Sequence, residues 1–135
     1  MNLSRILLAD DHQLLLGQVA ILLQPSFHVV GSTHNGLEMI SEVMRLQPDV
    51  IVADISMPIL SGIDAAHQLK EAGCLFKVVF LTIHAEKAFV DACLAEGALD
   101  YVVKSHIRTD LILAIKGALS GSLLFLQQSL ANIHR

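Results

Sequence analysis

The stretch that decides the fold is VIVAD at residues 50–54, four apolar residues in a row followed directly by a carboxylate. Two similar runs, ILLA at residues 6–9 and VVFL at residues 78–81, lie before and after it. Short continuous apolar runs are typical of strands in a parallel sheet whose two faces are both covered. We therefore interpret these three runs as central strands.

Helical periodicity separates the strands. Apolar residues at positions i, i+3, i+4, i+7 and i+8 predict a helix over residues 85–93 and another over 111–119. The second is preceded by Thr109 as the cap and Asp110 as the first-turn acid, and it ends near Gly121. More polar runs at residues 27–30 and 99–103 complete a set of five strands, as expected near sheet edges. This alternation predicts an α/β fold: a doubly wound five-stranded parallel sheet with helices on both faces.

Composition restricts the function classes. The 135 residues suit one domain, and with 9 Lys+Arg against 13 Asp+Glu the formal charge of −4 disfavours nonspecific nucleic-acid binding. Apolar residues make up 53% of the chain, which excludes a disordered tail, yet no run of about 20 apolar residues could span a bilayer. The N-terminal apolar run is too short for a secretory signal. We expect a cytoplasmic protein with no membrane partner.

Chemically reactive side chains follow the strands. Asp10 and Asp11 come after the first strand, Asp54 after the third, Thr82 after the fourth and Lys104 after the fifth. The carboxyl ends of parallel strands share one edge, where ligands bind in such sheets. Three carboxylates brought together repel one another unless a cation lies among them, and oxygen ligands suit Mg²⁺. The set is typical of phosphoryl transfer, with one carboxylate as nucleophile.

Several motifs resemble one family. ADDH at residues 9–12, VIVADISMPILSG at 50–62, LTIH at 81–84 and DYVVKS at 100–105 are similar, in this order, to the receiver (CheY-like) domain of bacterial two-component response regulators. The opening DDH and the LTIH motif resemble in particular the NarL/FixJ (LuxR-like) type. The resemblance covers nearly the whole chain and implies the flavodoxin-like strand order 2-1-3-4-5.

The resemblance assigns roles to the acidic residues. It implies that Asp54 is the phosphoacceptor, which takes a phosphoryl group from a sensor histidine kinase. It implies that Asp10, Asp11 and Asp54 hold Mg²⁺ together with the backbone carbonyl of Ser56, with Asp11 as a direct ligand. By this resemblance the chain is not a dedicated enzyme but a phosphoacceptor that assists its own phosphorylation and dephosphorylation.

The same resemblance implies a switch. Thr82 would bond the phosphoryl oxygen, Lys104 would form an ion pair with it, and Tyr101 would turn inward to fill the space that Thr82 leaves. In the loop after the phosphoacceptor the matching residues are Met57, Pro58 and Gly62; Pro58 fixes φ, and Gly62 permits a close approach to the next helix.

The positions around the phosphoacceptor also differ from many receivers. Ser56 and His84 flank Asp54 and are candidates for tuning dephosphorylation. Ile83 is bulkier than the residue that many receivers place there, and we expect it to narrow access to Asp54.

The first predicted helix is a candidate partner surface. Residues 13–24 carry no charge, so we expect Leu15, Leu16 and Val19 to form a homodimer or partner surface.

We expect the receiver domain to span residues 1–121, with 122–135 as a C-terminal extension or the start of a linker. The resemblance implies control of transcription, but DNA would be bound only through an output domain outside this sequence.

Two other functions are alternatives to a phosphoacceptor receiver. Haloacid-dehalogenase-type phosphatases also use an aspartyl nucleophile, but they need a second Asp two residues later, where this chain has Ser56. A pseudo-receiver that serves only as a phosphorylation-independent interaction or dimerisation module is the second alternative. It is less favoured, because Asp10, Asp54 and Lys104 are all present.

Overall fold

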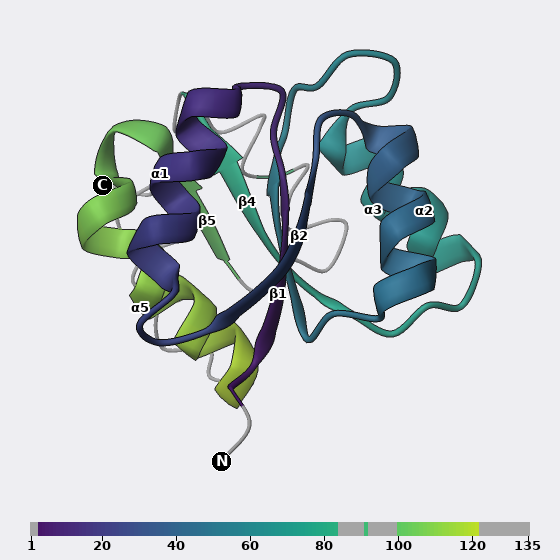
Figure 1. Ribbon diagram of the computed structural model, residues 1–135. Helices are drawn as coiled ribbons and strands as arrows, with labels where there is room; N and C mark the ends of the chain where they lie inside the picture. Colours follow the sequence, from purple (N-terminus) through teal and green to yellow (C-terminus); the bar gives the residue numbers. More distant parts are fainter. Residues whose placement is uncertain (1–2, 84–90, 92–99, 122–135) are drawn as a thin grey trace.

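A computed structural model describes residues 3–83, 91 and 100–121 of the chain (Figure 1). Along the chain, the elements are β1 (Arg5–Ala9), α1 (Gln13–Leu23), β2 (His28–Thr33), α2 (Gly36–Leu46), β3 (Val50–Asp54), α3 (Gly62–Glu71), β4 (Lys77–Thr82), β5 (Asp100–Val103), the 3₁₀ turn η1 (Lys104–His106) and α5 (Ile107–Ser120).

The strands form one parallel sheet in the order β2-β1-β3-β4-β5. The three apolar runs β1, β3 and β4 occupy the interior, and the more polar β2 and β5 lie at the edges. Both the predicted architecture and the predicted order are confirmed. Because β3 pairs with β1 on one side and β4 on the other, its C-terminal residue Asp54 lies near the middle of the carboxyl edge.

Helices cover both faces, as predicted: α1 and α5 lie on one side of the sheet, and α2 and α3 lie on the other (Figure 1). Alternate residues of each strand supply the two cores. In β3, for example, Val50 and Val52 pack towards α1 and α5, whereas Ile51 and Ala53 pack towards α2 and α3. This two-residue alternation explains why the central strands are apolar throughout.

Helix ends follow local capping rules. The Asn35 side chain accepts a hydrogen bond from the Glu38 N–H at the start of α2. Helix α5 ends, as predicted, at Gly121, whose φ of 68° is left-handed. It begins at Ile107 with His106 at the N-cap position, so the prediction of Thr109 as the cap is wrong, whereas the prediction of Asp110 as a first-turn acid is confirmed. Both residues lie in its first turn, where the Thr109 hydroxyl donates back to the His106 carbonyl.

Helix α1 corrects the predicted partner surface. Leu16 and Val19 are only 7% and 3% exposed, because they pack against the sheet, and Leu15 is half-buried. Leu16 and Val19 are therefore core residues, and the interpretation of them as an interface is wrong. The exposed apolar residues of α1 are Leu14 and Ile21.

Some predictions fall outside the described residues: the helix over 85–93, His84, and the extension at 122–135. Among the helices of the described part of the chain, none is both long enough and apolar enough to span a membrane.

Candidate functional site

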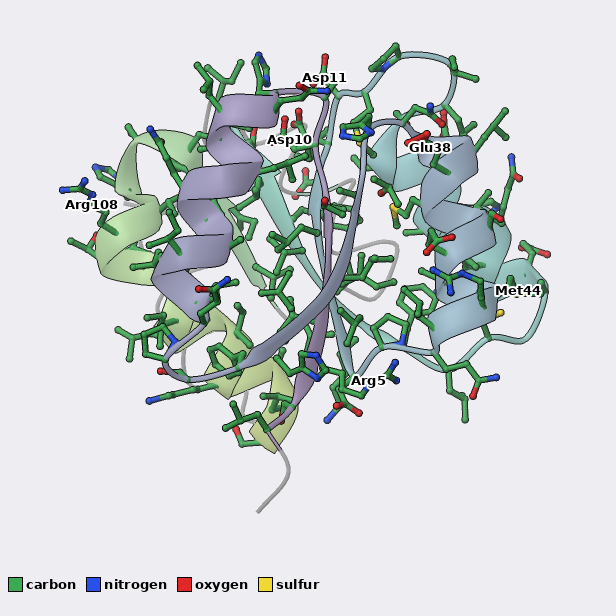
Figure 2. All side chains as sticks on the ribbon, in the orientation of Figure 1. Arg5, Asp10, Asp11, Glu38, Met44 and Arg108 are labelled. Carbon is green, nitrogen blue, oxygen red and sulfur yellow. The ribbon has the colours of Figure 1, made fainter. Side chains whose placement is uncertain are left out.

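The side chains expected at the strand ends do meet at the carboxyl edge of the sheet. Asp10 follows β1, Asp54 ends β3 and Thr82 ends β4, and these residues are 1%, 4% and 5% exposed. Asp11 is exposed beside them, and Figure 2 shows Asp10 and Asp11 at the upper end of β1. Buried carboxylates at the end of an apolar sheet need charged or polar partners.

Lys104 is the partner of both buried carboxylates. Its Nζ lies 2.8 Å from Asp10 Oδ2 and 3.0 Å from Asp54 Oδ2. Burial alone would lower the pKa of the ammonium, but its contacts with Asp10 and Asp54 outweigh burial and raise that pKa. Lys104 therefore remains charged between the two acids. It can reach them because β5 ends at Val103, directly before it.

The Asp54 carboxylate accepts hydrogen bonds from the backbone of Ser56 and the side chain of Lys104. Its Oδ1 accepts a hydrogen bond from the Ser56 N–H at 3.2 Å, and its Oδ2 accepts one from Lys104. Burial raises the pKa of Asp54; the hydrogen bond from Lys104 opposes this effect, and the charge of Asp10 adds to it, so the pKa lies above its usual value. The ionised form is thus destabilised, a condition that an added cation would relieve.

His12 belongs to the cluster, although the sequence analysis gave it no role. Its backbone N–H and its ring Nδ1 each lie 2.9 Å from Asp10 Oδ1, and Nδ1 is 3.4 Å from Asp11 Oδ1. The only sequence signal for this contact is that His12 follows the acidic pair. Ligand atoms of Asp10, Asp11, His12 and Asp54 all lie within 4.8 Å of one another.

These residues fit a divalent cation. Asp10 Oδ2 is buried and lies 2.8 Å from Lys104 Nζ, and a carboxylate oxygen with one such partner can still accept a second. Among the described residues, three carboxylates gather around the one ammonium of Lys104, so negative charge is in excess there. Hard oxygen donors with this excess charge are the donor set that Mg²⁺ prefers.

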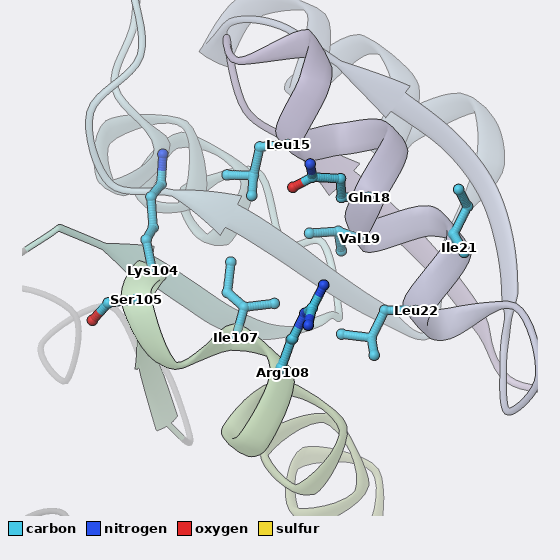
Figure 3. A pocket seen from close by; sticks show the side chains of 9 residues that line it. All are labelled: Leu15, Gln18, Val19, Ile21, Leu22, Lys104, Ser105, Ile107 and Arg108. Atoms are coloured by element: carbon cyan, nitrogen blue, oxygen red, sulfur yellow. The ribbon is translucent and has the colours of Figure 1, made fainter.

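Asp11 and Asp54 line a recess of about 200 Å³, which is large enough for a phosphoryl group and water. Its lining consists of Asp11, His12, Asp54, Ile55, Ser56, Thr82 and Ile83. A larger groove of about 440 Å³ runs between α1 and the start of α5 (Figure 3). It is bordered by Leu15, Gln18, Val19, Ile21, Leu22, Lys104, Ser105, Ile107 and Arg108, none of which is an acid, so the reactive carboxylates belong to the smaller recess.

The expected switch residues lie on neighbouring strands. Thr82 pairs with Val103 across β4 and β5, and Phe80 pairs with Tyr101. Residues two apart in a strand share a face, so Thr82 and Tyr101 have their side chains on the same side of the sheet. Tyr101 is half-buried and packs against the core beneath α2 and α3.

The loop between β3 and α3 makes the close backbone approach that was predicted at Gly62. Met57 is buried, and the Gly62 N–H donates to the Ile55 carbonyl at 3.0 Å. A Cβ on Gly62 would lie 2.0 Å from the Asp54 carbonyl oxygen, so only glycine permits this approach. Ser56, expected to flank the phosphoacceptor, is exposed at the recess.

Comparisons with known proteins agree with this geometry. The chain is 33% identical over 97% of its length to the transcriptional regulatory protein YvfU of Bacillus subtilis, and 30% identical over 96% to DesR of the same organism. It spans about 66% and 65% of those proteins.

Solved structures are similar as well. The receiver domain of the response regulator NarL from Mycobacterium tuberculosis matches with a TM-score of 0.84 and 27% identity, over 90% of this chain and 99% of that one. A LuxR-family response regulator from Aurantimonas sp. SI85-9A1 matches with a TM-score of 0.86 and 26% identity, over 98% and 99%.

Residues 6–116 match the response regulator receiver domain family. This match includes all five strands except Arg5, the first residue of β1, and it includes the whole recess. The relatives are LuxR/NarL-family regulators. The chain therefore belongs to the response regulator receiver domains.

Proposed function

We propose that this receiver accepts a phosphoryl group on Asp54 from the phosphohistidine of a sensor kinase. An Oδ atom of Asp54 forms the new P–O bond while the P–N bond of the donor breaks, and the released imidazole takes up a proton from solvent. The observation that carries this proposal is the position of the Asp54 carboxylate: it is buried, open to the recess and poorly stabilised as an anion.

Mg²⁺ is the proposed cofactor, held by Asp10, Asp11 and Asp54 together with the backbone carbonyl of Ser56. When bound, it would offset the negative charge that accumulates as the phosphoryl group arrives. The protein supplies a second cation, since Lys104 already lies 3.0 Å from Asp54 Oδ2. Lys104 can form an ion pair with a phosphoryl oxygen after a small shift from Asp10.

Phosphorylation would act on shape through Thr82 and Tyr101. A phosphoryl group adds a charge of about −1.5 to −2 and three strong acceptors at the recess. The Thr82 hydroxyl is on the strand next to Asp54 and can bond one of them, while Tyr101, on the same face, can follow into the space released. Because Lys104 begins η1, which leads into α5, the change would be passed to that helix.

Intact-protein mass spectrometry tests the proposal. The wild type and Asp54→Asn are incubated with Mg²⁺ and phosphoramidate, a small donor with a P–N bond. We expect a single phosphoryl adduct on the wild type and none on the variant. Without an adduct on the wild type from this donor or from a phosphorylated kinase, the pseudo-receiver alternative would replace the proposal.

Output and localisation are proposed from the relatives. Their names describe transcriptional regulators, and this chain spans about 66% and 65% of their lengths. We therefore propose that the receiver controls transcription through a DNA-binding domain outside residues 1–135. A cytoplasmic location follows from that role. We further propose that the chain forms a homodimer through the exposed face of α1, with Leu14 and Ile21 in place of the buried Leu16 and Val19.

A further inference from the structure

His12 places an imidazole nitrogen beside the carboxylates at the carboxyl edge of the sheet. Its Nδ1 lies 2.9 Å from Asp10 Oδ1 and 3.4 Å from Asp11 Oδ1. In a metal site with bonds of about 2.1 Å, neighbouring ligand atoms lie about 3.0 Å apart in octahedral coordination and about 3.4 Å apart in tetrahedral coordination. The three atoms are therefore already spaced as ligands of one small cation.

Lys104 contacts the other oxygen of each buried acid. Its Nζ lies 2.8 Å from Asp10 Oδ2 and 3.0 Å from Asp54 Oδ2, whereas the oxygens near the imidazole are the Oδ1 atoms of Asp10 and Asp11. The same Nζ lies 3.4 Å from His12 Nδ1. Asp11 and His12 both line the recess, and Lys104 does not. A cation that enters through the recess thus meets a carboxylate oxygen and an imidazole nitrogen.

Helix formation and core packing do not account for a histidine at this position. His12 is the N-cap residue of α1, but its side chain makes no capping hydrogen bond, and Ser, Thr, Asp or Asn caps a helix better. The side chain is 61% exposed, so it adds little to the core. Its place is fixed by the turn after β1, where the His12 backbone N–H donates to Asp10 Oδ1 at 2.9 Å.

An imidazole nitrogen affects some divalent cations more than others. Mg²⁺ is a hard ion that takes oxygen ligands and keeps several waters. Zn²⁺ and the late first-row transition ions accept imidazole readily, and carboxylates also bind Zn²⁺. The acids of the cluster therefore serve both classes of ion, whereas His12 favours only the second class.

We propose that His12 Nδ1 is a metal ligand and that the preference of this cluster for Zn²⁺-like ions over Mg²⁺ depends on it. The oxygen ligands are Asp10, Asp11 and Asp54, whose ligand atoms lie within 4.8 Å of one another and of the imidazole. The inference rests on the proposed function in one respect, since the ion is held by the same carboxylates as Mg²⁺. It does not require that Asp54 accepts a phosphoryl group.

Calorimetric titration with Zn²⁺ alone and with Mg²⁺ alone tests the inference on the wild type and His12→Gln. Loss of a partner that only orients a ligand costs about 10–100-fold in metal affinity, so loss of the ligand itself should weaken Zn²⁺ binding by at least about tenfold. Mg²⁺ binding should change by less than about threefold, because Mg²⁺ takes oxygen ligands.

His34→Gln is the matched control. His34 is also exposed, but its Nδ1 lies 3.3 Å from a single carboxylate, that of Glu38. This variant should bind both ions as the wild type does. Asp54→Asn should weaken the binding of both ions, because it removes a carboxylate that they share.

Nitrogen NMR of the protein with isotope-labelled histidines gives a second measurement, which needs no altered site. The His12 resonances are assigned by their absence from the spectrum of His12→Gln. Zn²⁺ should shift the His12 Nδ1 resonance of the wild type at one equivalent of the ion, and Mg²⁺ should leave it in place. A Zn²⁺-bound wild type whose His12 Nδ1 does not shift would contradict the proposed ligand directly.

Other results would also overturn the inference. An equal loss of Zn²⁺ and Mg²⁺ affinity in His12→Gln would show that His12 acts through charge and not as a ligand. An unchanged Zn²⁺ affinity in His12→Gln, or an equal loss in His34→Gln, would assign the ion to other groups. The proposed function fails separately, when neither phosphoramidate nor a phosphorylated kinase labels the wild type in Mg²⁺, whatever the result with Zn²⁺.

Discussion

Replacing Gly62 with alanine should destabilise the fold and displace the phosphoacceptor. The new Cβ would lie 2.0 Å from the Asp54 carbonyl oxygen, where an ordinary contact is at least 3.4 Å, so the backbone has to move by more than 1 Å. Overpacking of this kind costs about 1–3 kcal/mol. Loss of the hydrogen bond from Gly62 to the Ile55 carbonyl adds about 1 kcal/mol.

The expected total for Gly62→Ala is about 2–4 kcal/mol, a large fraction of the ~5–15 kcal/mol that stabilises a typical domain. With a urea m-value of about 1–3 kcal/mol/M, the unfolding midpoint should fall by roughly 1 M or more. The same movement shifts Asp54, so labelling by phosphoramidate should slow even at temperatures where the variant is folded.

Gly17→Ala is the matched control. Gly17 lies in the middle of α1, and a Cβ there would meet nothing within 4 Å. Alanine is favoured over glycine in a helix by about 1 kcal/mol, so this variant should raise the midpoint and leave labelling unchanged. A midpoint for Gly62→Ala within about 0.3 M of the wild type would refute the reasoning from the close approach.

Three further predictions follow from burial and charge. Asp54→Asn should raise the free energy of unfolding at pH 7–8 in the absence of divalent cations. The pKa of Asp54 is raised in the folded protein, so the ionised carboxylate destabilises the fold at any pH above that pKa. In urea unfolding at a series of pH values, the gain should disappear as the pH falls below the unfolded pKa of about 3.9. Leu14→Glu with Ile21→Glu should convert a dimer to a monomer by light scattering, and an unchanged mass would contradict the α1 interface. Leu111→Ala should cost about 2–5 kcal/mol in chemical denaturation, whereas Leu113→Ala, at 57% exposure, should stay within about 0.5 kcal/mol.

The sheet was predictable because its central strands are buried on both faces. Residues 50–54 have no polar position before Asp54, and a short run rich in β-branched residues such as this one favours a parallel strand covered on both faces. The boundaries were less predictable. The start of α5 at Ile107 follows the η1 turn, and no side-chain hydrogen bond caps the helix there, so the usual capping signal does not mark this boundary.

The buried face of α1 could not be predicted, for a physical reason. Periodicity identifies a buried face by contrast with polar residues on the other side, and α1 has no charged residue on any side. Leu14 and Leu16 are equally apolar, yet one is 86% exposed and the other 7%. Only the packing of the helix on the sheet separates them.

The site was predictable in its members but not in its contacts. Strand ends in a parallel sheet converge, so Asp10, Asp54 and Lys104 could be placed together from the sequence. The contact of His12 with Asp10 could not, since it depends on a turn between β1 and α1. The turn at Ile59 was equally unpredictable: its φ is +70°, and the Leu60 N–H donates to the Pro58 carbonyl at 2.7 Å, yet isoleucine is not among the usual turn residues.

Lys104 connects the chemistry to the rest of the domain. Its ammonium is shared between Asp10 and Asp54 in this structure, and both contacts are short. A phosphoryl group on Asp54 would turn one carboxylate into a more highly charged acceptor further into the recess, so the ammonium could not keep both contacts at their present lengths. Lys104 also begins the η1 turn that sets the first turn of α5. A change in its partners would act on the turn directly before α5, which gives the proposed phosphorylation a physical route from Asp54 to that helix.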